Sequence, residues 1–256
     1  MAIGDTDWYG VEDYWTFNRE LIWSESLVDS SARAAEKVFS LLGMKRGQSL
    51  LDLACGFGRH SVEFSRLGLR VTGVDINGPL IEEASETARS MGLDTRFVQR
   101  DMRDFREPES YDHIIMMFNS FGYFHDPGDD VRVLENCCGS LVPGGSLLIS
   151  ITGREILGRH LRTGRNRSWR EEKGRIVLEE IEVNDEWDWM TTSWKVIDGS
   201  SRTEWQYGMR IYGKDEIVDL LEGCGFTGAR TMGRLDGTPY GSDAVALMVL
   251  AGKPAE

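Results

Sequence analysis

Hydrophobic and polar residues alternate in blocks along the first 152 residues of the chain. Residues 28–43 place apolar side chains at helical spacing, with Asp29 or Ser30 in front and Gly43 behind, which predicts an amphipathic helix. Helical stretches at 59–67, 79–91 and 129–141 end at glycines or at the Pro143-Gly144-Gly145 turn. Short apolar runs around them predict strands at 48–54, 70–75, 95–99, 112–118 and 146–152. This alternation predicts an α/β fold with a mostly parallel, doubly wound sheet.

The pattern changes at residues 168–212. Three β-prone stretches, RIVLEEIEV, WDWMTTSWKVI and RTEWQYGMRIY, are separated by turn signals at Asn184-Asp185 and Asp198-Gly199. They predict an antiparallel meander inserted into the α/β core. The core pattern then returns, with a helix at 214–223 and strands near 226–233 and 244–252.

Composition narrows the class of protein. Hydrophobic residues make up 41% of the 256 residues, which is ample for a layered core. The formal charge is −13, and an acidic surface repels phosphate backbones and anionic lipids, so we expect neither a nucleic-acid nor a membrane partner. No apolar run reaches the roughly 18 residues of a membrane span, and the N-terminus lacks the pattern of a secretory signal. The four cysteines lack metal-ligand spacing, which predicts reduced thiols in the cytoplasm and no metal site.

The stretch LLDLACGFG, residues 50–58, carries the first chemical signal. Small residues at Ala54, Gly56 and Gly58 follow a predicted strand and precede a predicted helix. Small residues let a ligand approach the backbone, and a helix start offers unpaired N–H groups, so the loop suits a nucleotide. A dinucleotide fingerprint needs G-x-G-x-x-G, so the spacing argues against a nicotinamide cofactor. A purely structural strand–helix turn is the alternative for this loop alone.

Two acidic residues end the next two predicted strands. Asp75 ends the second strand, where a carboxylate can accept hydrogen bonds from a ribose diol. Asp101 ends the third strand, where it could accept from an adenine amino group. Either acid alone could cap a turn. Together, beside a loop of small residues, they predict a nucleoside site in the crevice where open α/β sheets bind ligands.

These segments together resemble the class I S-adenosylmethionine-dependent methyltransferases. LLDLACGFG is similar to that family's first motif, GVDIN to its ribose-binding motif, RDMRDF to its adenine-binding motif, and FNSFGYF to the segment beside the transferable methyl. LVPGGSLLI and RIYGKDEIVDLLEGCGF look like the turn into the fifth strand and the helix before the last strand pair. The resemblance covers residues 44–152 and 210–252. It implies a seven-stranded sheet with the last strand antiparallel, S-adenosylmethionine as cofactor and S-adenosylhomocysteine as product.

The resemblance also implies the residues of the cofactor site. They are the strand-end acids, the small-residue loop and their neighbours: Asp52, Ala54, Cys55, Gly56, Gly58, Asp75, Ile76, Asp101, Met102 and Phe118. Similar amino-sugar N-methyltransferases carry an aromatic pair eight residues apart in an N-terminal lid helix, and Trp15 and Trp23 have that spacing. We therefore divide the chain into N-terminal lid helices (1–43), a cofactor-binding core (44–152), an inserted substrate-side helix and meander (153–212), and a C-terminal completion of the core sheet (213–256).

Two further groups of residues have alternative interpretations. The tryptophans of the meander either form an aromatic wall for an acceptor or fix half-buried strands to the core. Trp187 and Trp189 are expected on one strand face. The basic run from Arg154 to Arg170 could attract an acidic acceptor, or could be a solvated helix face followed by a mobile loop.

Methyl transfer requires the protein to align the attacking atom, to exclude water and to leave that atom a free lone pair. The candidates near the methyl are Tyr123 and His125, with Asn119 as an orienting group, although His125 could equally be a plain loop residue. The similar amino-sugar enzymes have a histidine at the position of Tyr123, so a histidine mechanism does not transfer. We expect methyl transfer to N or O of a small-molecule acceptor. A macromolecular acceptor and cofactor binding without turnover are the alternatives.

Overall fold

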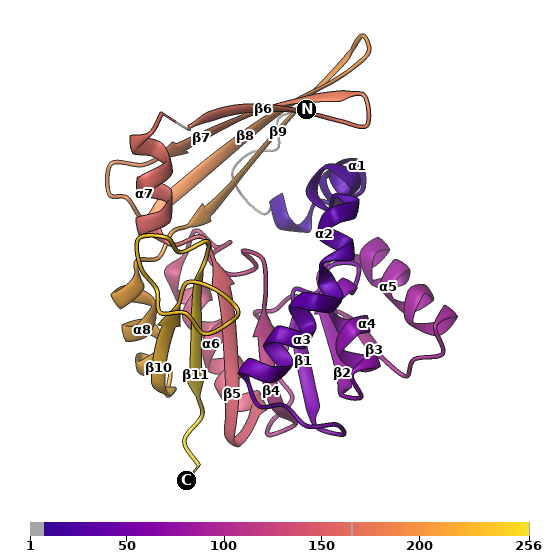
Figure 1. Cartoon of the computed structure of the whole chain (residues 1–256), viewed down its shortest axis with the longest axis vertical. Helices are drawn as coiled ribbons and strands as arrows, with labels where there is room; N and C mark the ends of the chain where they lie inside the picture. The colour runs from indigo at the N-terminus through magenta and orange to yellow at the C-terminus, as the bar shows by residue number, and fades with distance from the viewer. Residues whose placement is uncertain (1–7, 165, 256) are drawn as a thin grey trace.

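The computed structural model describes residues 8–164 and 166–255, and within them the chain forms two β-sheets (Figure 1). The larger sheet has seven strands in the order β10-β11-β5-β4-β1-β2-β3. Their bounds are β1 Ser49–Leu53, β2 Arg70–Asp75, β3 Arg96–Gln99, β4 Tyr111–Met116, β5 Leu141–Ile151, β10 Thr227–Met232 and β11 Leu247–Gly252. Strands β1 to β5 run parallel to one another, whereas β11 runs antiparallel to both β5 and β10. The predicted fold class is therefore confirmed, including the antiparallel last strand.

Helices cover both faces of the larger sheet because successive strand residues point to opposite faces. Their bounds are α3 Ser31–Leu41, α4 Arg59–Arg66, α5 Gly78–Ser90, α6 Pro127–Ser140 and α8 Lys214–Gly223. Leu51 and Ile114 are buried in one core cluster with residues of α6 and α8. Leu50 and Ile115 are buried in another cluster with residues of α3 and α4. Within the described parts of the chain, no helix is both long and apolar enough to cross a membrane.

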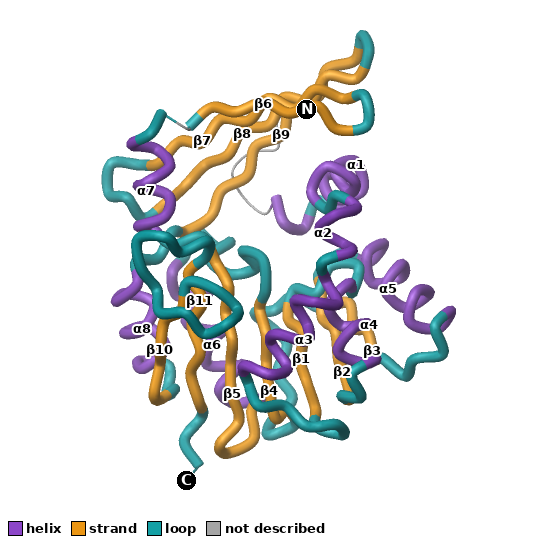
Figure 2. The backbone as a smooth tube through the Cα atoms, viewed as in Figure 1, coloured by secondary structure: helices purple, strands orange, loops and turns teal. Residues whose placement is uncertain are grey.

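A second, antiparallel sheet stands apart from the first (Figures 1 and 2). It follows α7 and consists of four strands in the order β6-β7-β8-β9. The bounds are α7 Arg154–Arg162, β6 Arg167–Glu172, β7 Arg175–Val183, β8 Trp189–Asp198 and β9 Ser201–Arg210. Both turn signals are confirmed, because the Asn184 side chain accepts the N–H of Trp189 at 3.0 Å and Asp198-Gly199 joins β8 to β9. The predicted meander is therefore this smaller sheet.

One of the two interpretations of the basic run, a solvated helix face followed by a mobile loop, does not hold for the last residues of the run. Residues 167–172 form β6, which pairs antiparallel with β7 along its whole length. Charged side chains suit this strand because it lies at the edge of the smaller sheet. Arg167, for example, donates from Nε to Glu180 Oε1 on β7 at 2.7 Å.

Two other local predictions are also wrong. Trp187 lies in the turn before β8 with a positive φ of 58°, so it does not share a strand face with Trp189. Residues 143–145 do not separate the helix from the strand, because β5 already begins at Leu141. The partner register shifts there, from Tyr111↔Leu141 to His113↔Ser146, so the glycines form an irregularity within the strand.

An N-terminal segment lies between the smaller sheet and the β2–β3 side of the larger sheet (Figure 2). It comprises η1 Trp8–Gly10, α1 Glu12–Ile22 and α2 Glu25–Asp29, and residues 1–7 of the predicted lid lie outside the described residues. Lys173 Nζ, in the β6–β7 turn, is 3.4 Å from Glu20 Oε1 of α1. On the other side, Arg19 donates from Nε to Glu83 Oε2 of α5 at 3.2 Å. The segment is thus held from both sides. The division of the chain into four parts stays a prediction.

Candidate functional site

A cavity of about 360 Å³ lies where the N-terminal segment, the smaller sheet and the carboxyl ends of the core strands meet. The core contributes Asp52, Ala54, Cys55, Gly56, Arg59, His60, Val74, Asp75, Ile76, Leu80, Arg100, Asp101, Met102, Met117, Phe118, Asn119, Ser120, Tyr123 and Phe124. The N-terminal segment contributes Trp8, Tyr9, Tyr14, Trp15, Leu21, Ile22 and Trp23. The smaller sheet contributes Arg170, Glu179, Met190, Trp194, Tyr207 and Met209. The volume is in the range of small-molecule sites, roughly 300–1,000 Å³.

The loop after β1 is built around Asp75. The Gly56 N–H donates to Asp75 Oδ2 at 2.8 Å, and the Asn77 N–H donates to Oδ1 at 2.9 Å. Burial raises the pKa of Asp75, and these backbone donors oppose that rise. Ala54, with a φ of 60°, and Gly56, with a φ of 56°, both take the left-handed conformation that turns this loop tightly.

Gly58 differs from its neighbours in this loop because it is not among the cavity-lining residues. It is the N-cap of α4 with a φ of 75°, and a Cβ there would come within 2.8 Å of Phe97 Cζ on β3. The close packing of α4 against β3 therefore explains why residue 58 is a glycine. Any contact of Gly58 with a cofactor stays a prediction.

Asp52 lines the cavity with 2% of its surface exposed. Burial raises its pKa from the ordinary 3.8 to about 6, although the Ser61 hydroxyl donates to Oδ2 at 2.6 Å and opposes the rise. The nearby Arg59 is also buried, which lowers the pKa of its guanidinium to about 10. The pair places a carboxyl group and a guanidinium cation beside the start of α4.

Asp101 and Met102, which follow β3, line the cavity, and their contact with a cofactor stays a prediction. Arg103 donates to both oxygens of the Asp101 carboxylate, from Nη2 at 2.7 Å and from Nε at 3.1 Å, and its backbone N–H adds a further bond at 2.8 Å. Burial alone would raise the pKa of Asp101, but these donors outweigh it and lower the pKa. The carboxylate therefore has little accepting capacity left for an adenine amino group.

The predicted tryptophan pair is present in the N-terminal segment. The rings of Trp15 and Trp23 stack with their centroids 5.7 Å apart and their planes 20° apart. Trp15 Nε1 donates to the Tyr9 carbonyl at 2.8 Å, and a Cβ on Gly56 would be 3.4 Å from Trp23 Cζ2. Both indoles line the cavity, and Trp23 covers the loop after β1.

The loop after β4 has two successive residues in the left-handed region, Phe118 (φ 61°) and Asn119 (φ 59°). Asn119 is tied to β5, because its N–H donates to the Ser150 carbonyl at 2.9 Å and its Oδ1 accepts the Thr152 N–H. The Phe118 ring stacks on His60 at 5.1 Å. His60 is 6% exposed, and its Nε2 is buried with no hydrogen-bond partner among the described residues.

The structure brings two of the three catalytic candidates to the cavity. Tyr123 and Asn119 line it, and the Tyr123 ring is 4.9 Å from Trp8. Burial raises the pKa of Tyr123 well above its ordinary value, so its hydroxyl is protonated at neutral pH. A catalytic role of Tyr123 stays a prediction. His125 is not among the lining residues, and its ring stacks on Trp189 at 4.1 Å. A role of His125 in catalysis stays a prediction.

Sequence reasoning offered an aromatic wall in the meander as one interpretation, but it missed Glu179 as part of that wall. Glu179 Oε2 accepts the indole N–H of Trp194 at 2.7 Å, and Arg170 Nη1 lies 3.8 Å from the same oxygen. The Arg170 guanidinium also lies 4.9 Å from the Trp194 ring centroid. The period of two residues in β7 and β8 could have grouped these side chains by face. Nothing in the sequence indicates which face meets the cavity.

The four cysteines are free thiols, and Cys55 lines the cavity. Burial raises the pKa of the Cys55 thiol well above its ordinary value, and the charges of Asp52 and Asp75 raise it further. Its thiol therefore stays protonated, which fits a small packing residue rather than a nucleophile. Within residues 8–164 and 166–255, no three His, Cys, Asp or Glu side chains converge as metal ligands would.

Comparison with known proteins identifies the core. Residues 50–145 match the family model described as a methyltransferase domain. The cypemycin N-terminal methyltransferase of Streptomyces sp is 27% identical over 106 residues, which are 41% of this chain and 42% of that protein. The ubiquinone biosynthesis O-methyltransferase of Coxiella burnetii is 29% identical over 111 residues, 43% of this chain and 46% of that one. The match thus spans less than half the length of these curated relatives.

Solved structures extend the likeness of fold to nearly the whole chain. An S-adenosylmethionine-dependent methyltransferase from Clostridium acetobutylicum has a TM-score of 0.75 at 18% identity, covering 94% of this chain and 98% of that one. A sugar N-methyltransferase from Streptoalloteichus has a TM-score of 0.68 at 19% identity, covering 99% of both chains. Residues 50–145 thus match a methyltransferase domain, and the chain as a whole has the fold of S-adenosylmethionine-dependent methyltransferases.

Proposed function

We propose that this protein transfers a methyl group from S-adenosylmethionine to a nitrogen or oxygen atom of a small-molecule acceptor. The observation that carries the proposal is the cavity that joins the loop after β1 to an aromatic chamber under the smaller sheet. A cofactor site and an acceptor site must share one space, because methyl transfer needs the attacking atom beside the methyl. The free thiols support a cytoplasmic enzyme, because that compartment keeps cysteines reduced.

The residues around the loop after β1 fit this cofactor. Each oxygen of Asp75 accepts one backbone N–H and can accept another hydrogen bond, which suits a ribose diol. Gly56 keeps a gap between the loop and the Trp23 ring that a side chain would fill. The buried Nε2 of His60, unpaired among the described residues, offers a polar ligand a hydrogen-bonding partner. When bound, S-adenosylmethionine supplies an electrophilic methyl, so the protein needs no strong activating group.

The chamber under the smaller sheet fits an acceptor with an apolar or aromatic body. Rings of Trp8, Tyr14 and Tyr207 lie within 5.1–5.9 Å of one another, from centroid to centroid. Glu179 adds a carboxylate that can accept a hydrogen bond from an amine or a hydroxyl group of the acceptor. These walls would exclude water and orient the attacking atom, which are the main tasks that remain for the protein.

A calorimetric titration with S-adenosylhomocysteine, run beside one with NAD, tests the cofactor. We expect wild type to bind the sulfur compound and not NAD. Asp75→Asn should weaken that binding roughly 10- to 100-fold, because it removes a charged acceptor. Asp94→Asn, which alters an exposed carboxylate away from the cavity, should bind as wild type does.

Turnover is tested with a panel of small amines and phenols and methyl-labelled S-adenosylmethionine. Label in any product supports the enzyme and identifies the atom. Binding of S-adenosylhomocysteine without transfer to any acceptor would favour cofactor binding without turnover. Failure of wild type to bind S-adenosylhomocysteine, alone or with the panel present, would refute the proposal.

A further inference from the structure

The end of strand β9 is where the three walls of the cavity meet. The Gly208 carbonyl accepts the indole N–H of Trp8, from the N-terminal segment, at 2.8 Å. Met209 lines the cavity itself. The Arg210 N–H donates to the Gly122 carbonyl, in the loop after β4, at 2.6 Å. Three consecutive residues of β9 therefore have three different tasks. Gly208 contacts the N-terminal segment, Met209 lines the cavity, and Arg210 contacts the loop that carries Tyr123.

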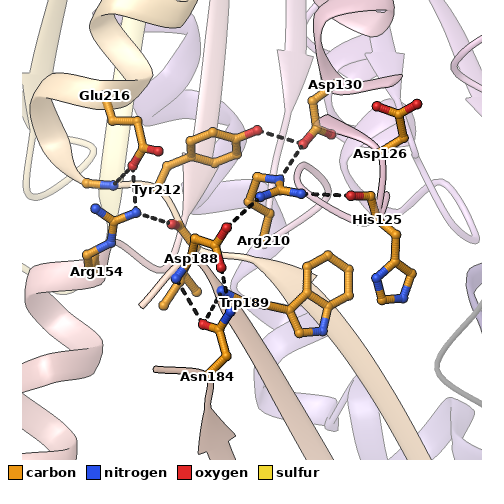
Figure 3. Close-up of polar contacts among 12 residues, drawn as sticks. His125, Asp126, Asp130, Arg154, Asn184, Asp188, Trp189, Arg210, Tyr212 and Glu216 are labelled. Carbon is orange, nitrogen blue, oxygen red and sulfur yellow. Dashed lines mark hydrogen bonds and ion pairs between the residues drawn. The ribbon is translucent and has the colours of Figure 1, made fainter. Parts of the chain in front are cut away.

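The Arg210 side chain extends these contacts to three further groups (Figure 3). Its Nη2 donates to the His125 carbonyl at 2.8 Å, and its Nη1 donates to Asp188 Oδ2, in the turn before β8, at 3.1 Å. Its Nε lies 3.8 Å from Asp130 Oδ2 on α6. The Arg210 side chain is only 13% exposed, and Asp130 is fully buried. The guanidinium thus joins the larger sheet's α6, the smaller sheet and the loop after β4 at one point.

These contacts hold the loop on both sides of Tyr123. Gly122 is bonded to the Arg210 backbone, and His125 is bonded to the Arg210 side chain. Gly122 has a φ of 95°, and a Cβ there would come within 2.7 Å of the Arg210 carbonyl oxygen, so loop and strand are in close contact. Between the two attachments, the Tyr123 ring faces the cavity and stacks on Tyr9 with the planes 11° apart.

Arginine suits this position better than lysine. A guanidinium offers five N–H donors in a rigid plane, so it can reach a carbonyl and two carboxylates in different directions, whereas an ammonium group is a compact point charge. The buried Asp130 also needs a cation nearby, although the Tyr212 hydroxyl donates to its Oδ2 at 2.6 Å. Burial raises the pKa of Asp130 to about 6, and Tyr212 and Arg210 oppose that rise.

We propose that Arg210 is a positioning residue for methyl transfer: it fixes the Tyr123 wall of the cavity against the smaller sheet and so sets the shape of the acceptor chamber. This inference rests on the proposed function for its effect on turnover. Arg210 does not itself line the cavity, so it acts through Tyr123 and Met209. None of the contacts of Arg210 described above reaches the cofactor end of the cavity, around Asp75 and the loop after β1. Replacing Arg210 should therefore affect cofactor binding much less than acceptor turnover.

The test compares Arg210→Lys with Arg202→Lys, an exposed arginine on the same strand, in the full chain. Hydrogen–deuterium exchange is measured on the peptides covering residues 118–126 and 8–23. Arg210→Lys should speed exchange in 118–126 at least about tenfold, because charge-assisted hydrogen bonds to the loop are lost. The Kd for S-adenosylhomocysteine should stay within about twofold, and Arg202→Lys should match wild type in both measurements.

Turnover of an acceptor from the amine and phenol panel supplies the second readout. Arg210→Lys should lower kcat/KM for the acceptor roughly 10- to 100-fold, because a misplaced wall disturbs the alignment of the attacking atom. Asp188→Asn removes the charge of one partner of Arg210 at an exposed turn, and it keeps the test valid if Arg210→Lys fails to fold. It should change the same quantities in the same direction, by a smaller factor.

The two proposals fail in different ways. If exchange in 118–126 and kcat/KM are unchanged in Arg210→Lys and in Asp188→Asn, the positioning role is wrong while the methyltransferase proposal stands. A loss of acceptor turnover matched by an equal loss of S-adenosylhomocysteine binding would also overturn it, because that pattern reflects general destabilisation. If wild type neither binds S-adenosylhomocysteine nor turns over any acceptor, the proposed function has failed, and the exchange data alone decide whether Arg210 holds the loop.

Discussion

Replacing Asp52 by asparagine should change how the stability of this protein depends on pH. The folded state raises the pKa of Asp52 from 3.8 to about 6, chiefly through burial. Because a tenfold change in an acid's ionisation constant is worth about 1.4 kcal/mol, ionised Asp52 lowers the free energy of unfolding by about 3 kcal/mol. This penalty is absent below about pH 3.8, where both states are protonated, and complete above about pH 6, where both are ionised. The contribution of Asp52 to the free energy of unfolding therefore falls as pH rises from about 3.8 to about 6.

The asparagine keeps the size of the side chain and an oxygen that can accept the Ser61 hydroxyl, but it does not ionise. From pH 5 to pH 8, the free energy of unfolding of Asp52→Asn should therefore rise relative to wild type by about 1.5 kcal/mol. Urea unfolding at the two pH values measures this difference. Taking the difference between variant and wild type removes the contributions of other titrating groups, including Asp130.

The exposed Asp94→Asn variant is the matched control, because it removes the same charge without the burial. Its relative stability should change by less than about 0.5 kcal/mol over the same range. A relative change for Asp52→Asn as small as that of the control would refute the reasoning. Such a result would mean that the folded protein solvates Asp52, or that the Ser61 hydroxyl and Arg59 compensate for its burial.

Three further changes give distinct expectations. Gly58→Ala should lower the free energy of unfolding by about 2–4 kcal/mol, because the new Cβ would lie 2.8 Å from Phe97 at a position with a positive φ. The control is Gly43→Ala, where φ is 61° but no atom lies within 4 Å. In the same thermal unfolding assay, it should lower the free energy of unfolding by only about 1 kcal/mol. Arg19→Gln should speed proteolysis within residues 8–23 without changing the melting temperature of the core, because it loses the contact with α5; unchanged cleavage would mean that other contacts hold the segment. Tyr123→Phe should keep kcat/KM within about threefold and leave its pH profile unchanged, because a protonated hydroxyl is not a base; a new pH limb would show that the hydroxyl takes part in proton transfer.

The strands and helices of the core followed closely from the sequence because each has a strong local signal. The run around Leu51 is apolar except for Asp52, and four successive residues of it are buried, as expected for a parallel strand covered on both faces. The helix predicted at 79–91 is α5, whose N-cap, Asn77, accepts the Leu80 N–H at 3.0 Å. The strand β6 was missed because its six residues are mainly charged, and only its pairing with β7 makes it a strand.

The cofactor end of the site was also predictable, because its residues lie within short motifs. Asp75 and the small-residue loop are brought together by the pairing of β1 with β2, which any doubly wound sheet would produce. For the acceptor end, the sequence indicated only that the inserted meander could contribute to it. Glu179 and Trp194 are directly paired across β7 and β8, but nothing local indicates that their face covers the ends of the core strands.

The sequence by itself determined the fold class, the order of most elements and the place of the loop that closes around Asp75. Its apolar periods and small-residue turns act within one element or between neighbours in the chain, where local geometry leaves few choices. Only the tertiary structure decided that His125 stacks on Trp189 and that Arg210 joins α6 and the smaller sheet to the loop after β4. These contacts depend on how the smaller sheet packs on the core. That packing is set by burial and hydrogen bonds between segments far apart in the chain, which no local pattern encodes.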